Sequence, residues 1–157
     1  MITIITGEIN SGKTNKMRDL YSKTQSGDGF LCMKTIKNNI HMGYDLVPIS
    51  QNNSMPFIRK KQFLKKSDKI IFHIGDYYFF EKAFYEAEEI IIRLLKEKID
   101  PIYIDELGLL ELQKKCFYNS IVKILKHNIP LILCVRKSCL QSIINLFNFS
   151  KYKIIEV

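Results

Sequence analysis

The chain has 157 residues and a formal net charge of +8, and this is the length of one ordinary domain that buries its own core. Apolar residues make up 46% and charged residues 25%, which is typical of a globular protein. We find no apolar stretch long enough to cross a membrane and no signal peptide, so we expect one domain over residues 1–157, acting as a cytoplasmic monomer.

An alternation of apolar strand-like runs and amphipathic helical segments extends along the chain. This pattern predicts an α/β fold with a mostly parallel, RecA-like sheet and helices on both faces. Residues 40–49 also alternate in polarity, which predicts an antiparallel hairpin extension of that sheet. The expected strands are 1–6, 30–33, 40–49, 69–74, 102–104, 131–135 and 152–157, and the expected helices are 14–25, 79–98, 113–127 and 137–147.

The stretch 50–68 is polar and basic, and we expect it to be a solvated loop, with a mobile flap near the phosphates as the alternative. Its basic run 59–66 is where a nucleic acid would bind. That run holds a single arginine, however, and specific nucleic-acid contacts favour arginine. Binding of nucleic acid is therefore permitted by the charge but is not the favoured interpretation.

Near the start of the chain, eight residues match G-x-x-x-x-G-K-[ST], the phosphate-binding loop. In this pattern the two glycines let the backbone curl around phosphate, the lysine reaches the β- and γ-phosphates, and the threonine hydroxyl binds Mg²⁺. A buried strand is expected before the loop and a helix after it, as the motif requires. We therefore expect a nucleotide to be bound by Gly7, Glu8, Ile9, Asn10, Ser11, Gly12, Lys13 and Thr14.

The run Ile102 to Ile104 is apolar and ends in Asp105 and Glu106, which is the form of a Walker B strand. In a doubly wound sheet this strand end lies beside the phosphate loop. We expect Asp105 to hold Mg²⁺ together with Thr14, and Glu106 to orient or deprotonate the attacking water. Arg136 follows the apolar strand 131–135 and is a candidate contact of the γ-phosphate, with a surface arginine as the equal alternative.

Several segments together resemble the small P-loop nucleoside-triphosphatases, the family of the cancer-related nucleoside-triphosphatase and its thermophilic prokaryotic relatives. The similar segments are residues 2–14, 29–30, 43–47, 104–112 and 135–136, so the resemblance spans nearly the whole chain. It implies slow, Mg²⁺-dependent hydrolysis of ATP, GTP and other nucleoside triphosphates with loose base selectivity. It also implies that the turn from Asp105 to Gly108 lies beside the phosphates, so that Gly108 is a candidate nucleotide contact.

Three functions remain open on the sequence. The favoured one is a nucleoside-triphosphatase in which Lys13 and Glu106 act on the bound nucleotide. The second is a P-loop kinase of nucleotides or small molecules, although a kinase commonly closes an arginine-rich lid over its substrates. The third is a nucleotide-dependent switch or adaptor that binds RNA or a protein partner.

Overall fold

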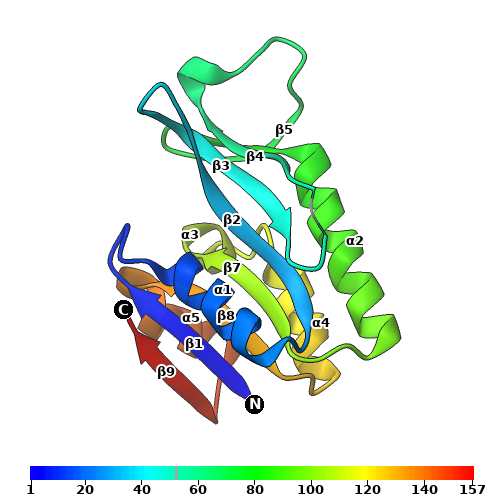
Figure 1. The fold of residues 1–157 in the computed structure, drawn as a ribbon. Coiled ribbons are helices and arrows are strands. Elements are labelled where there is room, and N and C mark those ends of the chain that lie inside the picture. Colours follow the sequence, from blue (N-terminus) through cyan, green and yellow to red (C-terminus); the bar gives the residue numbers. More distant parts are fainter. Residues whose placement is uncertain (52) are drawn as a thin grey trace.

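A nine-stranded mixed sheet forms the centre of the computed structural model, which describes residues 1–51 and 53–157 (Figure 1). One half of the sheet is parallel and has the order β2-β7-β8-β1-β9. This half confirms the predicted parallel α/β arrangement. Its strands are β1 (Ile2–Gly7), β2 (Asp28–Lys37), β7 (Ile102–Leu107), β8 (Leu131–Arg136) and β9 (Tyr152–Glu156).

The other half of the sheet is antiparallel and larger than the predicted hairpin. Beyond β2 it continues in the order β3-β4-β6-β5, with β3 at Ile40–Pro48, β4 at Met55–Lys60, β6 at Tyr77–Phe80 and β5 at Ile70–Ile74. Only the first residues of β2 pair with β7, so the rest of β2 carries this half beyond the end of the parallel strands (Figure 1). The antiparallel half therefore stands above one edge of the parallel half.

The segment 50–68, predicted as a solvated loop, contains strand β4, so the prediction is wrong over residues 55–60; Asn52 lies outside the described residues. The reason is Arg59, whose guanidinium is buried in β4 with Nη2 2.6 Å from Asp45 Oδ1. Its Nη1 also donates to the carbonyl of Tyr44. A buried charge is tolerated when it is paired in this way, and the pairing takes Arg59 away from any lid or nucleic-acid contact. Lys61, Lys65 and Lys66 remain exposed.

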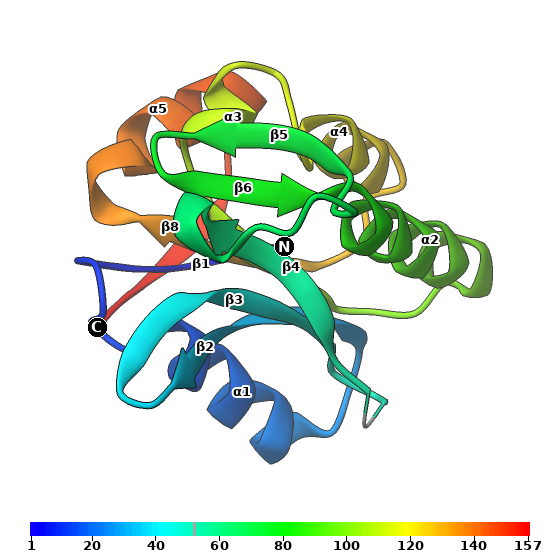
Figure 2. The ribbon, with the colours of Figure 1, turned by 90° about the horizontal axis from the view of Figure 1, so that it is seen from above.

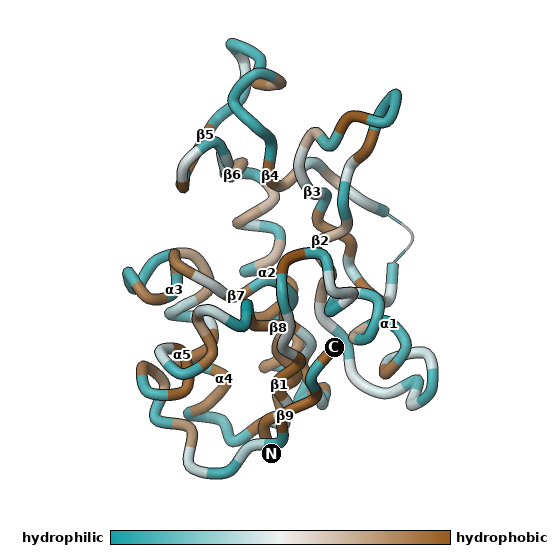
Figure 3. The backbone as a smooth tube through the Cα atoms, turned by 90° about the vertical axis from the view of Figure 1, so that its left-hand side faces the viewer, coloured by the Kyte–Doolittle hydropathy of each residue, from teal (hydrophilic) through white to brown (hydrophobic). Residues whose placement is uncertain are grey.

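Helices cover both faces of the sheet, as predicted, but unequally (Figure 2). Helix α1 (Lys13–Thr24) covers one face, where Met17 packs on a small apolar cluster with Ile5, Leu31 and Tyr103. The opposite face carries the main core beneath α2 (Glu81–Glu97), α4 (Tyr118–Lys126) and α5 (Leu140–Phe147). In Figure 3 the tube is coloured mainly hydrophobic along β1 and β8, whereas the turns at the tips of the antiparallel half are mainly hydrophilic.

Three helices begin later than the sequence pattern predicts. Helix α5 begins at Leu140 rather than at residue 137, because Lys137–Cys139 forms a 3₁₀ turn. Helix α2 begins at Glu81, because Tyr77–Phe80 forms β6 and pairs with β4 and β5. Helix α4 begins at Tyr118 and is preceded by the short α3 (Leu109–Leu112). Between them Lys114 and Cys116 have φ angles of 57° and 52°, and a left-handed residue cannot continue a right-handed helix. Across the described ranges 1–51 and 53–157, no helix has the length and apolar character needed to span a bilayer.

Asp28 ties the start of β2 to the end of β3 and to α2. Its carboxylate accepts hydrogen bonds from the backbone N–H of Gly29 at 2.7 Å, from Ser50 Oγ at 2.7 Å and from Arg93 Nη2 at 2.9 Å. Burial acts to raise the pKa of Asp28, but these hydrogen bonds outweigh it, and the pKa is lowered overall. The ionised carboxylate is therefore the form that stabilises the fold.

We expect Asp28→Asn to lower the free energy of unfolding by about 2 kcal/mol at pH 7, because it weakens charge-assisted hydrogen bonds that are largely buried. The deficit should be fully present above the unfolded-state pKa of about 3.9 and should shrink as the pH falls through the lower folded-state pKa. Urea unfolding at pH 7 and pH 3 measures both values. The exposed Asp19→Asn is the matched control, and an equal deficit at the two pH values would contradict the assignment.

Candidate nucleotide-binding site

The predicted site residues converge at the edge where the parallel strands end. In the register of the sheet Gly7 of β1 lies beside Arg136 of β8, and Leu107 of β7 lies beside Val135. The phosphate loop, the acidic end of β7 and Arg136 therefore meet at one edge, below the antiparallel half (Figure 1). Ligands of open α/β sheets bind at this edge.

The loop between β1 and α1 is curled as a phosphate cradle requires. Asn10 and Gly12 have positive φ angles, 66° and 98°, and α1 begins at Lys13 directly after the loop. A Cβ on Gly7 would collide with the Ser11 side chain and the carbonyl of Val157, so only glycine fits there. The Lys13 ammonium donates to the carbonyls of Gly7 and Glu8, at 3.2 and 2.8 Å. Its charge thus lies inside the cradle where an anion would contact it.

A cavity of about 190 Å³ opens over this loop, and we call it the nucleotide cavity because the loop motif predicts a nucleotide there. Five loop residues line it: Ile9, Asn10, Gly12, Lys13 and Thr14. Gly7, Glu8 and Ser11 belong to the loop but do not line the cavity, and Glu8 is exposed. Cys32, Met33, Lys34 and Tyr44 close the cavity from the antiparallel half, while Glu106 and Arg136 close it from the strand ends.

Tyr44 is one of the wall residues to which sequence reasoning gave no role. Burial, reinforced by the charge of Glu106, raises the pKa of Tyr44 to about 12. The hydroxyl is therefore protonated at neutral pH and is available as a hydrogen-bond donor. Tyr44 belongs to the stretch 43–47 that resembles the nucleoside-triphosphatases, and this was the one signal in the sequence that pointed to it.

Asp105 is fully buried beneath the loop. Its Oδ2 accepts the backbone N–H of Cys32 at 3.0 Å, whereas its Oδ1 has no hydrogen-bond partner among the residues that the structure describes. Burial, and then the charge of Glu106, raises the pKa of Asp105 to about 6, although the Thr14 hydroxyl lies near enough to lower it. An unpartnered buried carboxylate oxygen beside a threonine hydroxyl is a donor set that suits Mg²⁺.

Glu106 and Arg136 face each other across the site. The backbone of Glu106 is left-handed, with φ 66°, and its Oε2 lies 3.7 Å from Arg136 Nε. This separation is an ion pair without a close hydrogen bond. Both side chains line the nucleotide cavity, so the pair places one carboxylate and one guanidinium beside the phosphate loop. Arg136 thus lies at the site rather than on a remote surface.

Gly108 lies outside the lining of the nucleotide cavity and lines an adjoining one. Its backbone N–H donates to Glu111 at 2.9 Å, and the same buried carboxylate accepts the N–H of Phe117 at 3.3 Å. Sequence reasoning quoted Glu111 only as part of the stretch 104–112. Glu111 lies three residues after Gly108, the residue at the N-cap of α3. A glutamate at this spacing can accept the N–H of the capping residue, and this spacing is the signal that could have identified it. Glu111 thereby holds the turn that carries Glu106 and Gly108.

Strand β1, its curled loop and α1, beside the acidic end of a neighbouring parallel strand, define the class of P-loop NTPases. A protein family described as NTPase matches residues 2–157 of this chain. The chain belongs to that family, and it is therefore an enzyme that hydrolyses nucleoside triphosphates.

Individual relatives agree with this assignment. Nucleoside-triphosphatase THEP1 of Sulfolobus acidocaldarius is 32% identical over 143 residues, which cover 85% of this chain and 76% of the relative. The crystal structure of THEP1 from Aquifex aeolicus superposes with a TM-score of 0.73 at 21% identity, covering 99% of this chain and 89% of the other. The solution structure of a human cancer-related nucleoside triphosphatase superposes with a TM-score of 0.66 at 19% identity, covering 99% of this chain and 87% of the other. These two structures confirm the fold.

Proposed function

We propose that the chain hydrolyses ATP, GTP and other nucleoside 5′-triphosphates to the diphosphate and phosphate, slowly and with Mg²⁺. The observation that carries the proposal is the buried Oδ1 of Asp105, which has no hydrogen-bond partner within residues 1–51 and 53–157 and lies near the Thr14 hydroxyl. Folding leaves a buried carboxylate oxygen without a partner only at a cost. A metal ion bound with the nucleotide would supply the missing interaction.

In this mechanism the loop N–H groups and Lys13 bind the phosphates, and Lys13 exchanges its carbonyl partners for phosphate oxygens. Thr14 and Asp105 would hold Mg²⁺, which neutralises charge on the β- and γ-phosphates. Glu106 orients a water and accepts its proton. Arg136 would leave Glu106 and stabilise the charge that develops on the departing groups.

Two features support slow turnover and broad base tolerance. Glu106 is paired with Arg136, and this pair must separate before the carboxylate can act on water. The cradle itself recognises phosphate through backbone groups and Lys13, and every nucleoside triphosphate shares those phosphates.

The test is phosphate release from ATP, GTP, CTP and UTP, each with Mg²⁺ and with EDTA. We expect comparable rates for the four nucleotides, within about tenfold, and loss of activity in EDTA because the triphosphate charge is then unneutralised. The assignment would be contradicted by activity that persists in EDTA. A strong preference for one base would contradict the broad tolerance alone.

A further inference from the structure

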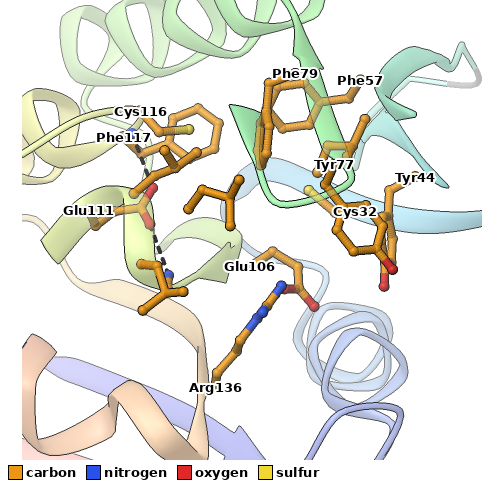
Figure 4. A pocket seen from close by; sticks show the side chains of 15 residues that line it. Cys32, Tyr44, Phe57, Tyr77, Phe79, Glu106, Glu111, Cys116, Phe117 and Arg136 are labelled. Atoms are coloured by element: carbon orange, nitrogen blue, oxygen red, sulfur yellow. Dashed lines mark hydrogen bonds and ion pairs between the residues drawn. The ribbon is translucent and has the colours of Figure 1, made fainter. Parts of the chain in front are cut away.

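A second cavity, of about 70 Å³, adjoins the nucleotide cavity. The two cavities share four lining residues, which are Cys32, Tyr44, Glu106 and Arg136. The second cavity therefore begins at the carboxylate of Glu106, which we propose to orient and deprotonate the attacking water. None of its lining residues belongs to the phosphate loop, and Figure 4 shows Glu106 and Arg136 at one end of it.

The walls of this cavity are mainly apolar. Phe57 of β4, Phe79 of β6 and Phe117 form its far side, and Leu110 of α3 and Ile74 of β5 add aliphatic surface. Phe57 and Phe117 are each only 1% exposed. Figure 4 shows these rings opposite Glu106 and Arg136, which extend into the cavity from the other end.

Glu111 also lines the cavity, but its carboxylate oxygens accept the backbone N–H groups of Gly108 and Phe117. Tyr44 and Tyr77 add two rings that carry hydroxyl groups. The cavity thus has a largely aromatic and aliphatic body, with the Glu106–Arg136 ion pair at one end.

Water can bind at the charged end of the cavity, but the part lined by Phe57, Phe79 and Phe117 offers it no polar side chain. A water needs several polar partners, and apolar cavities stay dry or take up apolar molecules. The volume is about half of the ~150 Å³ that accommodates benzene in a cavity lined by Leu, Ile and Phe. An apolar group of three or four carbons is therefore the right size. At the charged end a hydroxyl can donate to Glu106 and accept from Arg136.

We propose that this cavity is a binding site for a small alcohol with an apolar body of three or four carbons, whose hydroxyl lies at Glu106 and Arg136. Binding of the alcohol itself does not depend on the proposed function. Its effect does rest on the role that we assign to Glu106, because the bound hydroxyl takes the position of the attacking water. The alcohol therefore slows phosphate release without displacing the nucleotide.

Isobutanol is the probe, and binding is measured by saturation-transfer NMR without nucleotide, so that the result stands even if hydrolysis fails. We expect binding in the millimolar range, appropriate to a ligand with few heavy atoms, together with at least a twofold loss of phosphate release at saturation. Methanol at the same concentration controls for solvent effects and should leave phosphate release unchanged. Absence of isobutanol binding to the wild type would overturn the proposal.

Leu109→Trp tests the location, because Leu109 lines the cavity and is 47% exposed, so a larger side chain there can fill the mouth without entering the core. Ile92→Trp on α2 is the matched control, with 46% exposure away from the cavity. Ile74→Phe is a second variant that fills the cavity, from the opposite wall, and it keeps the test valid if Leu109→Trp does not fold. We expect both filling variants to lose isobutanol binding at least tenfold and the control to retain it. Equal binding by all three would overturn the proposal.

Discussion

Glu106→Gln is expected to lower the rate of phosphate release by about 10²–10⁴-fold and to leave nucleotide affinity nearly unchanged. The amide preserves the size of the side chain but cannot accept the proton of the attacking water. The phosphates are held mainly by the loop and Lys13, which the substitution does not touch. Single-turnover phosphate release and equilibrium binding of a fluorescent nucleotide measure the two effects separately.

The control for this prediction is Glu89→Gln, which removes the same charge from an exposed position on α2. It should match the wild type in both measurements. If Glu106→Gln kept the wild-type rate, the role of Glu106 as the residue that activates water would be wrong. If the variant lost nucleotide binding instead, Glu106 would have to act on the phosphates or the metal.

Asp105→Asn is expected to raise the Mg²⁺ concentration needed for half-maximal activity by about 10–100-fold, because a neutral amide oxygen replaces a carboxylate in the metal's environment. We also expect the same substitution to raise the stability of the fold. The buried Oδ1 of Asp105 has no hydrogen-bond partner among the described residues, so removal of its charge should stabilise the fold when Mg²⁺ is chelated.

The pH dependence gives the sign of this second effect. Burial, with the charge of Glu106, raises the pKa of Asp105 to about 6, above an unfolded-state value of about 3.9. The protonated side chain is therefore the form that the fold favours, and the metal-free wild type should lose stability as the pH rises from about 4 to about 6. The Asn variant should lack that loss.

Thermal unfolding in EDTA across this pH range, beside an Mg²⁺ titration of activity, checks both parts. Addition of Mg²⁺ and nucleotide should stabilise the wild type more than the variant, because ligands that bind only the folded state stabilise it by mass action. A variant that is less stable than the wild type at pH 7 in EDTA would show that Asp105 has a structural role instead. An unchanged Mg²⁺ requirement would remove Asp105 from the metal site.

The phosphate loop, its flanking strand and helix, and the acidic end of β7 were predictable because their signals are local. Gly7, Gly12, Lys13 and Thr14 lie within eight consecutive residues, and their spacing alone specifies the curled backbone and the side chains along it. The parallel strands could also be predicted, since strands buried on both faces form continuous apolar runs such as 131–135.

The antiparallel half was decided by contacts between segments far apart in the sequence. Arg59 lies in a strand because Asp45 neutralises it, and Tyr77–Phe80 is a strand because β4 and β5 lie on either side of it. Neither partner is visible from local composition. The same pairings bring Tyr44 over the phosphate loop and form the apolar cavity behind Glu106. The sequence alone therefore determined the phosphate-loop motif and the elements that flank it. The tertiary structure decided which side chains face that loop, because only long-range strand pairing places them there.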